Sequence, residues 1–289
     1  MPPGSTQVRR FTVPGGLSLE ADVGGDARNP AVILMHGGGQ TRHSWHNAML
    51  ELIARGHHVI NLDARGHGHS DWAADGDYSG AAMVSDLRAV AATLRAPPAL
   101  VGASMGGATA LLAVGACEPM AARALVLVDV VPQIERAGAD KILEFMRANR
   151  GGFATLDEAA DAVTAYYPHR PRPRDYSGLM KNLRRRADGR LYWHWDPRFV
   201  DGVRRIEPPQ YADQLSEAAR RVRVPALLVR GLQSDIVSDE GVRRLREMLP
   251  ALEVVDIAGA GHMVAGDKND AFSRGVVDFL RRTVPGTQP

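Results

Sequence analysis

Short apolar runs alternate with helix-like segments along most of the chain. After a predicted hairpin of residues 8–13 and 18–23, apolar runs predict strands near residues 31–35, 57–62, 99–103, 124–130, 224–230 and 252–257. Between two of these runs, Met83, Leu87 and Val90 keep the spacing of one helix face. The alternation predicts an α/β fold whose eight strands form a mostly parallel sheet, with helices on both faces.

The segment 133–223 departs from this alternation. It carries several helical patterns, among them Leu156 to Tyr167, and it falls between two predicted strands. An insertion there would cover the carboxyl ends of the sheet, where open α/β sheets bind ligands. We therefore expect a core of residues 1–132 and 224–289 and an inserted helical cap, or lid, of residues 133–223. The alternative is a structural excursion that packs elsewhere on the surface.

A serine lies in a sharp turn after the apolar run at 99–103. The pattern Gly102-Ala103-Ser104-Met105-Gly106 stands between a predicted strand and a predicted helix. Such a strand–turn–helix arrangement exposes a nucleophilic hydroxyl at the end of a sheet, and glycines are needed where the backbone segments approach closely. Ser104 is therefore predicted to be a nucleophile.

A serine nucleophile needs a base and a group that orients the base. Asp235 follows the predicted strand at 224–230, and His262 follows the one at 252–257. The order Ser104, Asp235, His262 is typical of this architecture, so we predict that His262 takes the serine proton and that Asp235 fixes its tautomer. Asp129, at the end of the strand at 124–130, is the alternative acid.

A glycine loop follows the predicted strand at 31–35. Backbone N–H groups in such a loop can point at a developing oxyanion, and Gly38 and Met105 are the predicted donors. Gly37 and Gly39 are expected to shape the loop beside the substrate, with Trp45 and Trp193 as candidate pocket walls. A flexible turn or a phosphate loop is the alternative, although the segment lacks the Gly-Lys-Ser/Thr ending of a P-loop.

Together these motifs resemble the α/β-hydrolase family. The matching pieces are His36–Gly39, Asp63–Ser70, Gly102–Gly107, Gly231–Asp235 and Gly261–His262. The resemblance covers nearly the whole chain and implies a cap-containing branch of serine esterases, lactonases and cofactor-free haloperoxidases. Dehalogenases and epoxide hydrolases of the family carry an aspartate where this chain has Ser104, which argues against an alkyl-enzyme mechanism.

Composition adds few constraints. The 289 residues suit one α/β domain with an insertion, and a net charge of +2 is too small to imply a nucleic-acid partner. Neither a signal-peptide pattern nor a membrane-length apolar segment is present, so a soluble, cytoplasmic protein is expected, with homo-oligomer formation left open. His67 and His69 near Asp63 could suggest a metal, but a tight loop explains them better, and no metal or cofactor is expected.

The predicted function is a cofactor-independent serine hydrolase. It would cleave a small or medium, largely apolar carboxylic ester or lactone through an acyl-enzyme. Carbon–carbon bond hydrolysis or perhydrolase activity would use the same triad and is the first alternative. A non-catalytic receptor that binds a small ligand on a hydrolase scaffold is the second.

Overall fold

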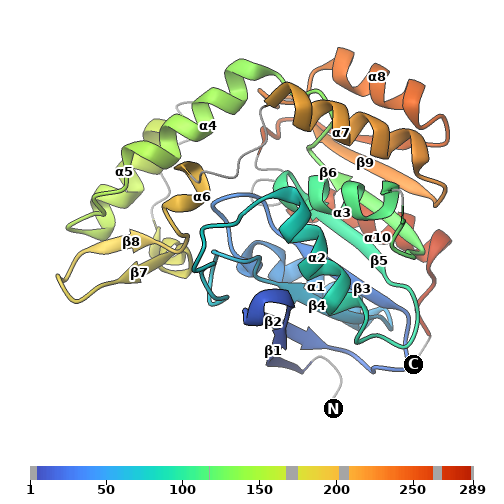
Figure 1. Ribbon diagram of the computed structural model, residues 1–289, viewed down its shortest axis with the longest axis horizontal. Coiled ribbons are helices and arrows are strands. Elements are labelled where there is room, and N and C mark those ends of the chain that lie inside the picture. Colours follow the sequence, from blue (N-terminus) through green and yellow to red (C-terminus); the bar gives the residue numbers. More distant parts are fainter. Residues whose placement is uncertain (1–4, 117, 167–174, 202–207, 263–268, 288–289) are drawn as a thin grey trace.

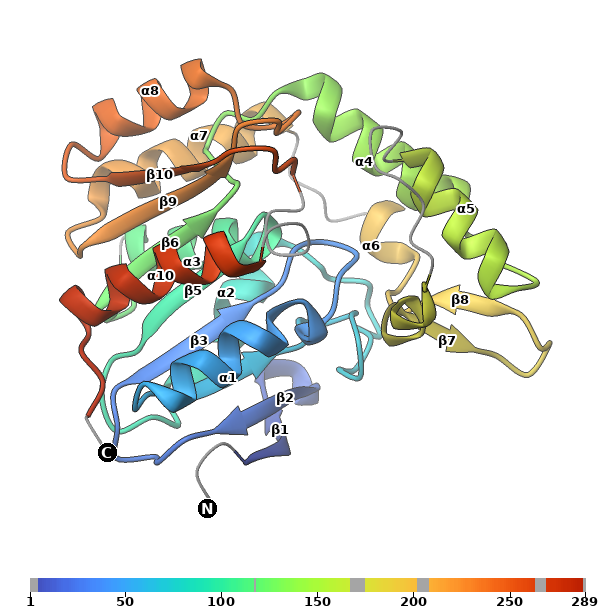
Figure 2. The same cartoon turned by 180° about the vertical axis from the view of Figure 1, so that it is seen from behind.

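The computed structural model describes residues 5–116, 118–166, 175–201, 208–262 and 269–287. Eight strands form one sheet in the order β1-β2-β4-β3-β5-β6-β9-β10 (Figures 1 and 2). Their bounds are β1 Thr6–Thr12, β2 Ser18–Gly24, β3 Ala31–Met35, β4 His58–Leu62, β5 Ala99–Ala103, β6 Ala124–Val128, β9 Ala226–Gly231 and β10 Glu253–Ile257. The β1–β2 and β2–β4 pairs are antiparallel, and the other pairs are parallel. The predicted α/β sheet is confirmed.

Helices cover both faces of the sheet, because its central strands are buried on both sides and need apolar partners. One face packs against α1 (His46–Ala54) and α10 (Asn269–Thr283), which lie in front in Figure 2. The other face packs against α2 (Gly80–Ala91), α3 (Met105–Gly115), α7 (Pro208–Arg221) and α8 (Asp239–Met248). Because strands β3, β4, β5, β6, β9 and β10 run parallel, their carboxyl ends lie at one edge of the sheet, where the predicted site residues follow them.

The segment between β6 and α7 stands to one side of the sheet (Figure 1). It contains α4 (Arg136–Ala148), α5 (Leu156–Tyr166), the 3-10 helix η3 (Ser177–Asn182), the hairpin β7 (Leu183–Arg185) and β8 (Leu191–Trp193), and α6 (Arg198–Asp201). This segment has an apolar cluster of its own, which includes Phe153, Leu183 and Trp193. We call the segment from α4 to α6 the cap.

Helix α7 falls inside the predicted cap range but packs with the core. Leu215, Ala218 and Ala219 belong to the same apolar cluster as the sheet and α3. At Gly115, a Cβ would lie 2.1 Å from the carbonyl oxygen of Ala218, so α3 and α7 touch backbone to backbone. The amphipathic pattern of α7 could not show which apolar surface it covers.

Candidate active site

Ser104 lies in the sharp turn that the sequence predicts, between β5 and α3. Its backbone has φ 44° and ψ −111°, and Ser104 and Asp129 are the two non-glycine residues with positive φ in the described parts of the chain. A Cβ on Gly102 would lie 2.4 Å from the carbonyl carbon of Gly106, so a side chain there would push the strand and helix apart. Strain of this kind is typical of functional positions.

The other positive-φ residue, Asp129, holds His262. The Nδ1 atom of His262 lies 2.8 Å from Oδ2 of Asp129, and the two side chains are 11% and 1% exposed. The amide of Ser104 donates to the carbonyl of Val128 at 3.0 Å, which places the serine turn directly beside the start of the Asp129 loop. The ends of β5, β6 and β10 thus bring Ser104, Asp129 and His262 to one edge of the sheet.

The structure does not place Asp235 on His262, so that pairing was wrong. The Asp235 carboxylate is 38% exposed and lies 3.2 Å from Nζ of Lys141 on α4, across the boundary between core and cap. The positive φ of Asp129 (48°) turns its side chain into the site directly from the end of β6. The loop after β9 contributes Ser234 instead, a residue that the sequence analysis missed because a lone serine beside an aspartate carries no motif.

The glycine loop after β3 leaves one amide available. The Gly37 amide donates to Oε1 of Gln40 at 3.1 Å, and the Gly39 amide donates to Nε2 of His67 at 3.1 Å. Among the described contacts, the Gly38 amide has no hydrogen-bond acceptor. A Cβ on Gly37 would lie 3.5 Å from Cβ of Ser104, so the loop runs beside the serine. The amides of Gly37 and Gly39 are therefore used in holding the loop.

The histidines near this loop are held as neutral rings. Nε2 of His67 accepts from Gly39, so its Nδ1 donates to the carbonyl of Arg65. Nε2 of His36 accepts from the Ala64 amide, so its Nδ1 donates to the carbonyl of Gly37. Burial lowers the pKa of both rings, to about 3 for His67. These rings tie the glycine loop to the loop after β4.

The described residues contain no cluster of three or more side chains able to hold a metal ion. His69, the second histidine considered as a metal ligand, is half exposed, and its Nδ1 lies 3.6 Å from Oε1 of Glu20. The Asp63 carboxylate pairs with the buried guanidinium of Arg42 and accepts a hydrogen bond from the His69 amide at 3.0 Å. His67, His69 and Asp63 thus each have a structural contact.

Apolar cap side chains reach the glycine loop. The ring of Phe199 lies 3.4 Å from where a Cβ on Gly38 would stand, and Met146 and Trp195 each come within 3.4 Å of the corresponding point on Gly39. The cap side chains that contact the glycine loop at Gly38 and Gly39 are therefore aromatic and aliphatic.

Hydrogen bonds connect the cap to the loop after β4. The amide of Asp196 donates to the carbonyl of Gly66 at 2.8 Å, and the Tyr78 hydroxyl donates to Oδ2 of Asp196 at 2.5 Å. Arg184 donates to the carbonyl of Gly68 at 2.5 Å. Asp196 is 1% exposed, and hydrogen bonds from Arg198 and Tyr78 outweigh its burial, so the pKa of its carboxyl is lowered. Its buried charge is thus well satisfied.

The two predicted pocket tryptophans differ. Trp45 is 1% exposed and packs in the core cluster with Met49 and Leu52, so its predicted role as a pocket wall is wrong. Trp193 stacks on Trp195 with ring centroids 5.1 Å apart and planes 9° apart. Trp193 therefore supports the ring that touches Gly39.

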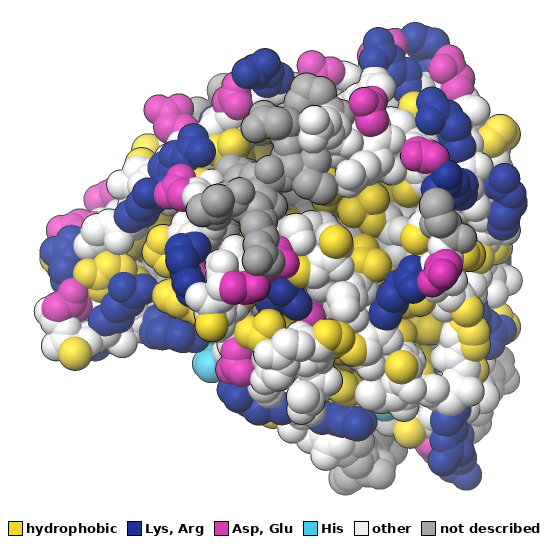
Figure 3. All heavy atoms as spheres, in the orientation of Figure 1, with side chains coloured by type: hydrophobic (Ala, Val, Ile, Leu, Met, Phe, Trp, Pro, Cys, Tyr) yellow, Lys and Arg dark blue, Asp and Glu magenta, His cyan; other side chains and the backbone are white. Residues whose placement is uncertain are grey.

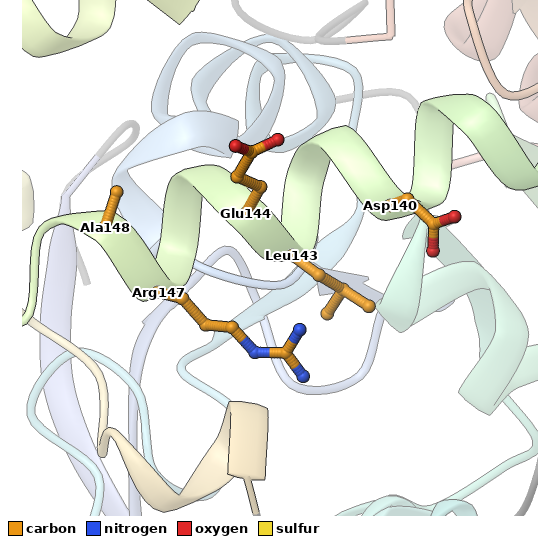
Figure 4. A pocket seen from close by; sticks show the side chains of 5 residues that line it. All are labelled: Asp140, Leu143, Glu144, Arg147 and Ala148. Atoms are coloured by element: carbon orange, nitrogen blue, oxygen red, sulfur yellow. The ribbon is translucent and has the colours of Figure 1, made fainter.

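A hollow of about 490 Å³ lies against α4, and its described lining comes entirely from that helix (Figure 4). It is lined by Asp140, Leu143, Glu144, Arg147 and Ala148. Most of these residues are exposed, whereas Met146, which reaches Gly39, is buried. The described lining of the hollow therefore lies on a different side of α4 from Met146.

Charged side chains of both signs are interspersed over the cap, α7 and α8 on the face in Figure 3. This distribution agrees with the small net charge of the chain. None of the helices in the described parts of the chain is both long and apolar enough to cross a membrane.

The chain belongs to the alpha/beta hydrolase fold family, whose pattern it matches over residues 30–268. It is 33% identical over 267 residues to the esterase Rv0045c of Mycobacterium tuberculosis, covering 88% of this chain and 84% of that protein. A crystal structure of that esterase superposes with a TM-score of 0.71 at 29% identity, covering 95% and 92% of the two chains.

A crystal structure of E-2-(acetamidomethylene)succinate hydrolase shares the fold, with a TM-score of 0.82 at 24% identity and coverage of 96% and 99%. At that identity the likeness shows the fold alone. The family match and the relatives named as esterases and hydrolases identify this chain as a hydrolase enzyme.

Proposed function

We propose that the chain is a serine hydrolase that uses Ser104, His262 and Asp129 to cleave a small or medium, largely apolar carboxylic ester or lactone. The observation that carries this proposal is the 2.8 Å contact between His262 and a buried aspartate, at the sheet edge where Ser104 stands in a strained turn. The esterase relatives agree with an ester as the substrate.

The proposed reaction follows from these positions. The Ser104 hydroxyl attacks the carbonyl carbon and passes its proton to Nε2 of His262, while Asp129 accepts from Nδ1–H and stabilises the imidazolium that forms. The amides of Gly38 and Met105 donate to the oxyanion. His262 then protonates the leaving alkoxide, and a water molecule activated by the same ring releases the acid.

The cap residues over the glycine loop support an apolar substrate. Phe199, Met146 and Trp195 place carbon atoms against Gly38 and Gly39, beside the proposed oxyanion donor. Burying one methylene of a substrate against such a surface contributes about 0.8 kcal/mol. We therefore expect a preference for esters with uncharged hydrocarbon acyl or alcohol groups.

A fluorophosphonate probe tests the nucleophile. We expect the probe to phosphonylate the intact protein at Ser104 and to abolish hydrolysis of p-nitrophenyl butyrate, with the modified peptide identified by mass spectrometry. Ser104→Ala should neither react nor hydrolyse, whereas Ser44→Ala, which changes a hydroxyl on the 3-10 helix η2 (Arg42–Trp45), should do both. Active protein that stays unlabelled at Ser104 would refute the proposal.

Phe199 is expected to limit substrate length. Phe199→Ala removes the ring that lies over Gly38 and leaves room for a longer acyl chain. For a p-nitrophenyl ester of eight or more acyl carbons, kcat/KM divided by that for the acetate should rise about fivefold. This corresponds to the burial of roughly one to two further methylenes. Steady-state kinetics over a series of acyl lengths measure the change. Phe145→Ala is the matched control within the cap, and an unchanged length profile in Phe199→Ala would contradict the assignment.

A further inference from the structure

The loop after β9 brings a hydroxyl, rather than a carboxylate, to the aspartate that holds His262. Oγ of Ser234 lies 2.6 Å from Oδ2 of Asp129, the same oxygen that His262 contacts at 2.8 Å. The other carboxylate oxygen, Oδ1, accepts from the Gly231 amide at 3.2 Å. Asp129 is therefore held at both oxygens, by the last residue of β9 and by the loop that follows it.

The direction of the Ser234 proton follows from its other contacts. The amides of Ile236 and Val237 donate to Oγ at 3.3 and 3.2 Å. A hydroxyl has two lone pairs and one proton, so with both lone pairs occupied the proton is left to point at Asp129. The bond is thus a charge-assisted hydrogen bond from a neutral donor whose orientation is fixed by the backbone.

We propose that Ser234 is a positioning residue for the Asp129–His262 pair; the inference rests on the function proposed above. The terminal torsion of an aspartate is broad, so an unrestrained carboxylate rotates readily. Ser234 and Gly231, bonded to opposite oxygens, set the plane of the carboxylate so that Oδ2 faces Nδ1 of His262. Ser234 acts through Asp129 and needs no contact with the substrate.

Replacing the hydroxyl tests this role kinetically. Ser234→Ala should lower kcat about tenfold with little change in KM, because the substrate surfaces are untouched while the imidazole is held less well. Ser234→Thr keeps a hydroxyl and should recover most of kcat. Ser238→Ala is the control in the same loop: Ser238 caps α8 by accepting from the Gly241 amide, so its loss should lower the melting temperature and leave kcat unchanged.

A spectroscopic measurement separates positioning from a loss of folded protein. The Nδ1 proton of His262, assigned by its absence in His262→Gln, should shift or broaden in the proton NMR spectrum of Ser234→Ala and stay in place in Ser238→Ala. An unchanged resonance together with unchanged kcat in Ser234→Ala would overturn the inference. This readout needs no turnover, so it still tests Ser234 if Ser104→Ala retains hydrolysis and the proposed function fails.

Discussion

Asp129→Asn is expected to reduce kcat by about 10⁴-fold while the protein stays folded, since loss of the charged partner leaves the histidine in the wrong tautomer. An asparagine either turns its amide nitrogen toward His262, which forces the proton onto Nε2, or keeps its oxygen there without the charge that stabilises the imidazolium. In both cases the ring no longer accepts the Ser104 proton effectively. Initial-rate kinetics with an activated ester, alongside far-UV circular dichroism, measure the effect.

Asp235→Asn is the matched comparison, because Asp235 follows β9, the strand paired with β6, and is the acid that the chain order predicts. It removes a half-exposed pair with Lys141, and such pairs contribute about 0–1 kcal/mol. We expect kcat to change by less than about threefold, within the effect of one surface pair. Equal losses in the two variants, or a larger loss in Asp235→Asn, would return the assignment to Asp235.

The serine turn and the strand order could be predicted because they rest on local rules. Gly102 and Gly106 mark a close approach that no side chain tolerates, and the alternation of apolar runs with helical spacing predicts a parallel sheet. His262 followed from the requirement that the base come after the last strand. These features depend on neighbours in sequence or on chain order alone.

The acid could not be settled in that way, because both candidates follow adjacent parallel strands. Asp129 directly follows β6 and Asp235 follows β9, and these strands are hydrogen-bonded to each other. Two features distinguish the candidates for the acid that contacts His262. Asp129 has a positive φ, and Asp235 pairs with Lys141 from the cap. Neither a backbone angle nor a partner 94 residues away in sequence is visible in an apolar pattern.

Trp45 and α7 show the same limit for packing. Trp45 follows the glycine loop closely, yet η2 turns its ring into the core beneath the sheet. Helix α7 is separated from the sheet strands by the cap, yet Ala218 packs on Gly115 of α3. An aromatic ring or an amphipathic helix indicates burial, but the surface that buries it is a tertiary property.

Replacing Arg65 by methionine is expected to lower the free energy of unfolding at pH 7 by about 3–5 kcal/mol, because it leaves a buried charge unpaired. Arg65 donates from Nε and from a terminal nitrogen to the two oxygens of Asp86, both at 2.6 Å, and both side chains are at most 6% exposed. It also donates to the carbonyl of Asp77 at 2.9 Å, which ties the loop after β4 to the start of α2. Urea denaturation followed by tryptophan fluorescence measures the loss.

The pH dependence of that loss identifies its cause. Burial raises the pKa of the Asp86 carboxyl, and the hydrogen bonds from Arg65 lower it, so removing Arg65 raises this pKa further. A carboxyl whose folded pKa exceeds its unfolded value destabilises the fold progressively as pH rises from the unfolded pKa to the folded pKa, and the full penalty is present above the folded pKa. The deficit of Arg65→Met should therefore shrink as pH falls from 7 toward 5. The double variant Arg65→Met, Asp86→Leu removes both charges and should regain much of the stability at pH 7. A deficit that is the same at both pH values and persists in the double variant would show that the lost Asp77 contact, rather than the stranded carboxylate, destabilises the fold.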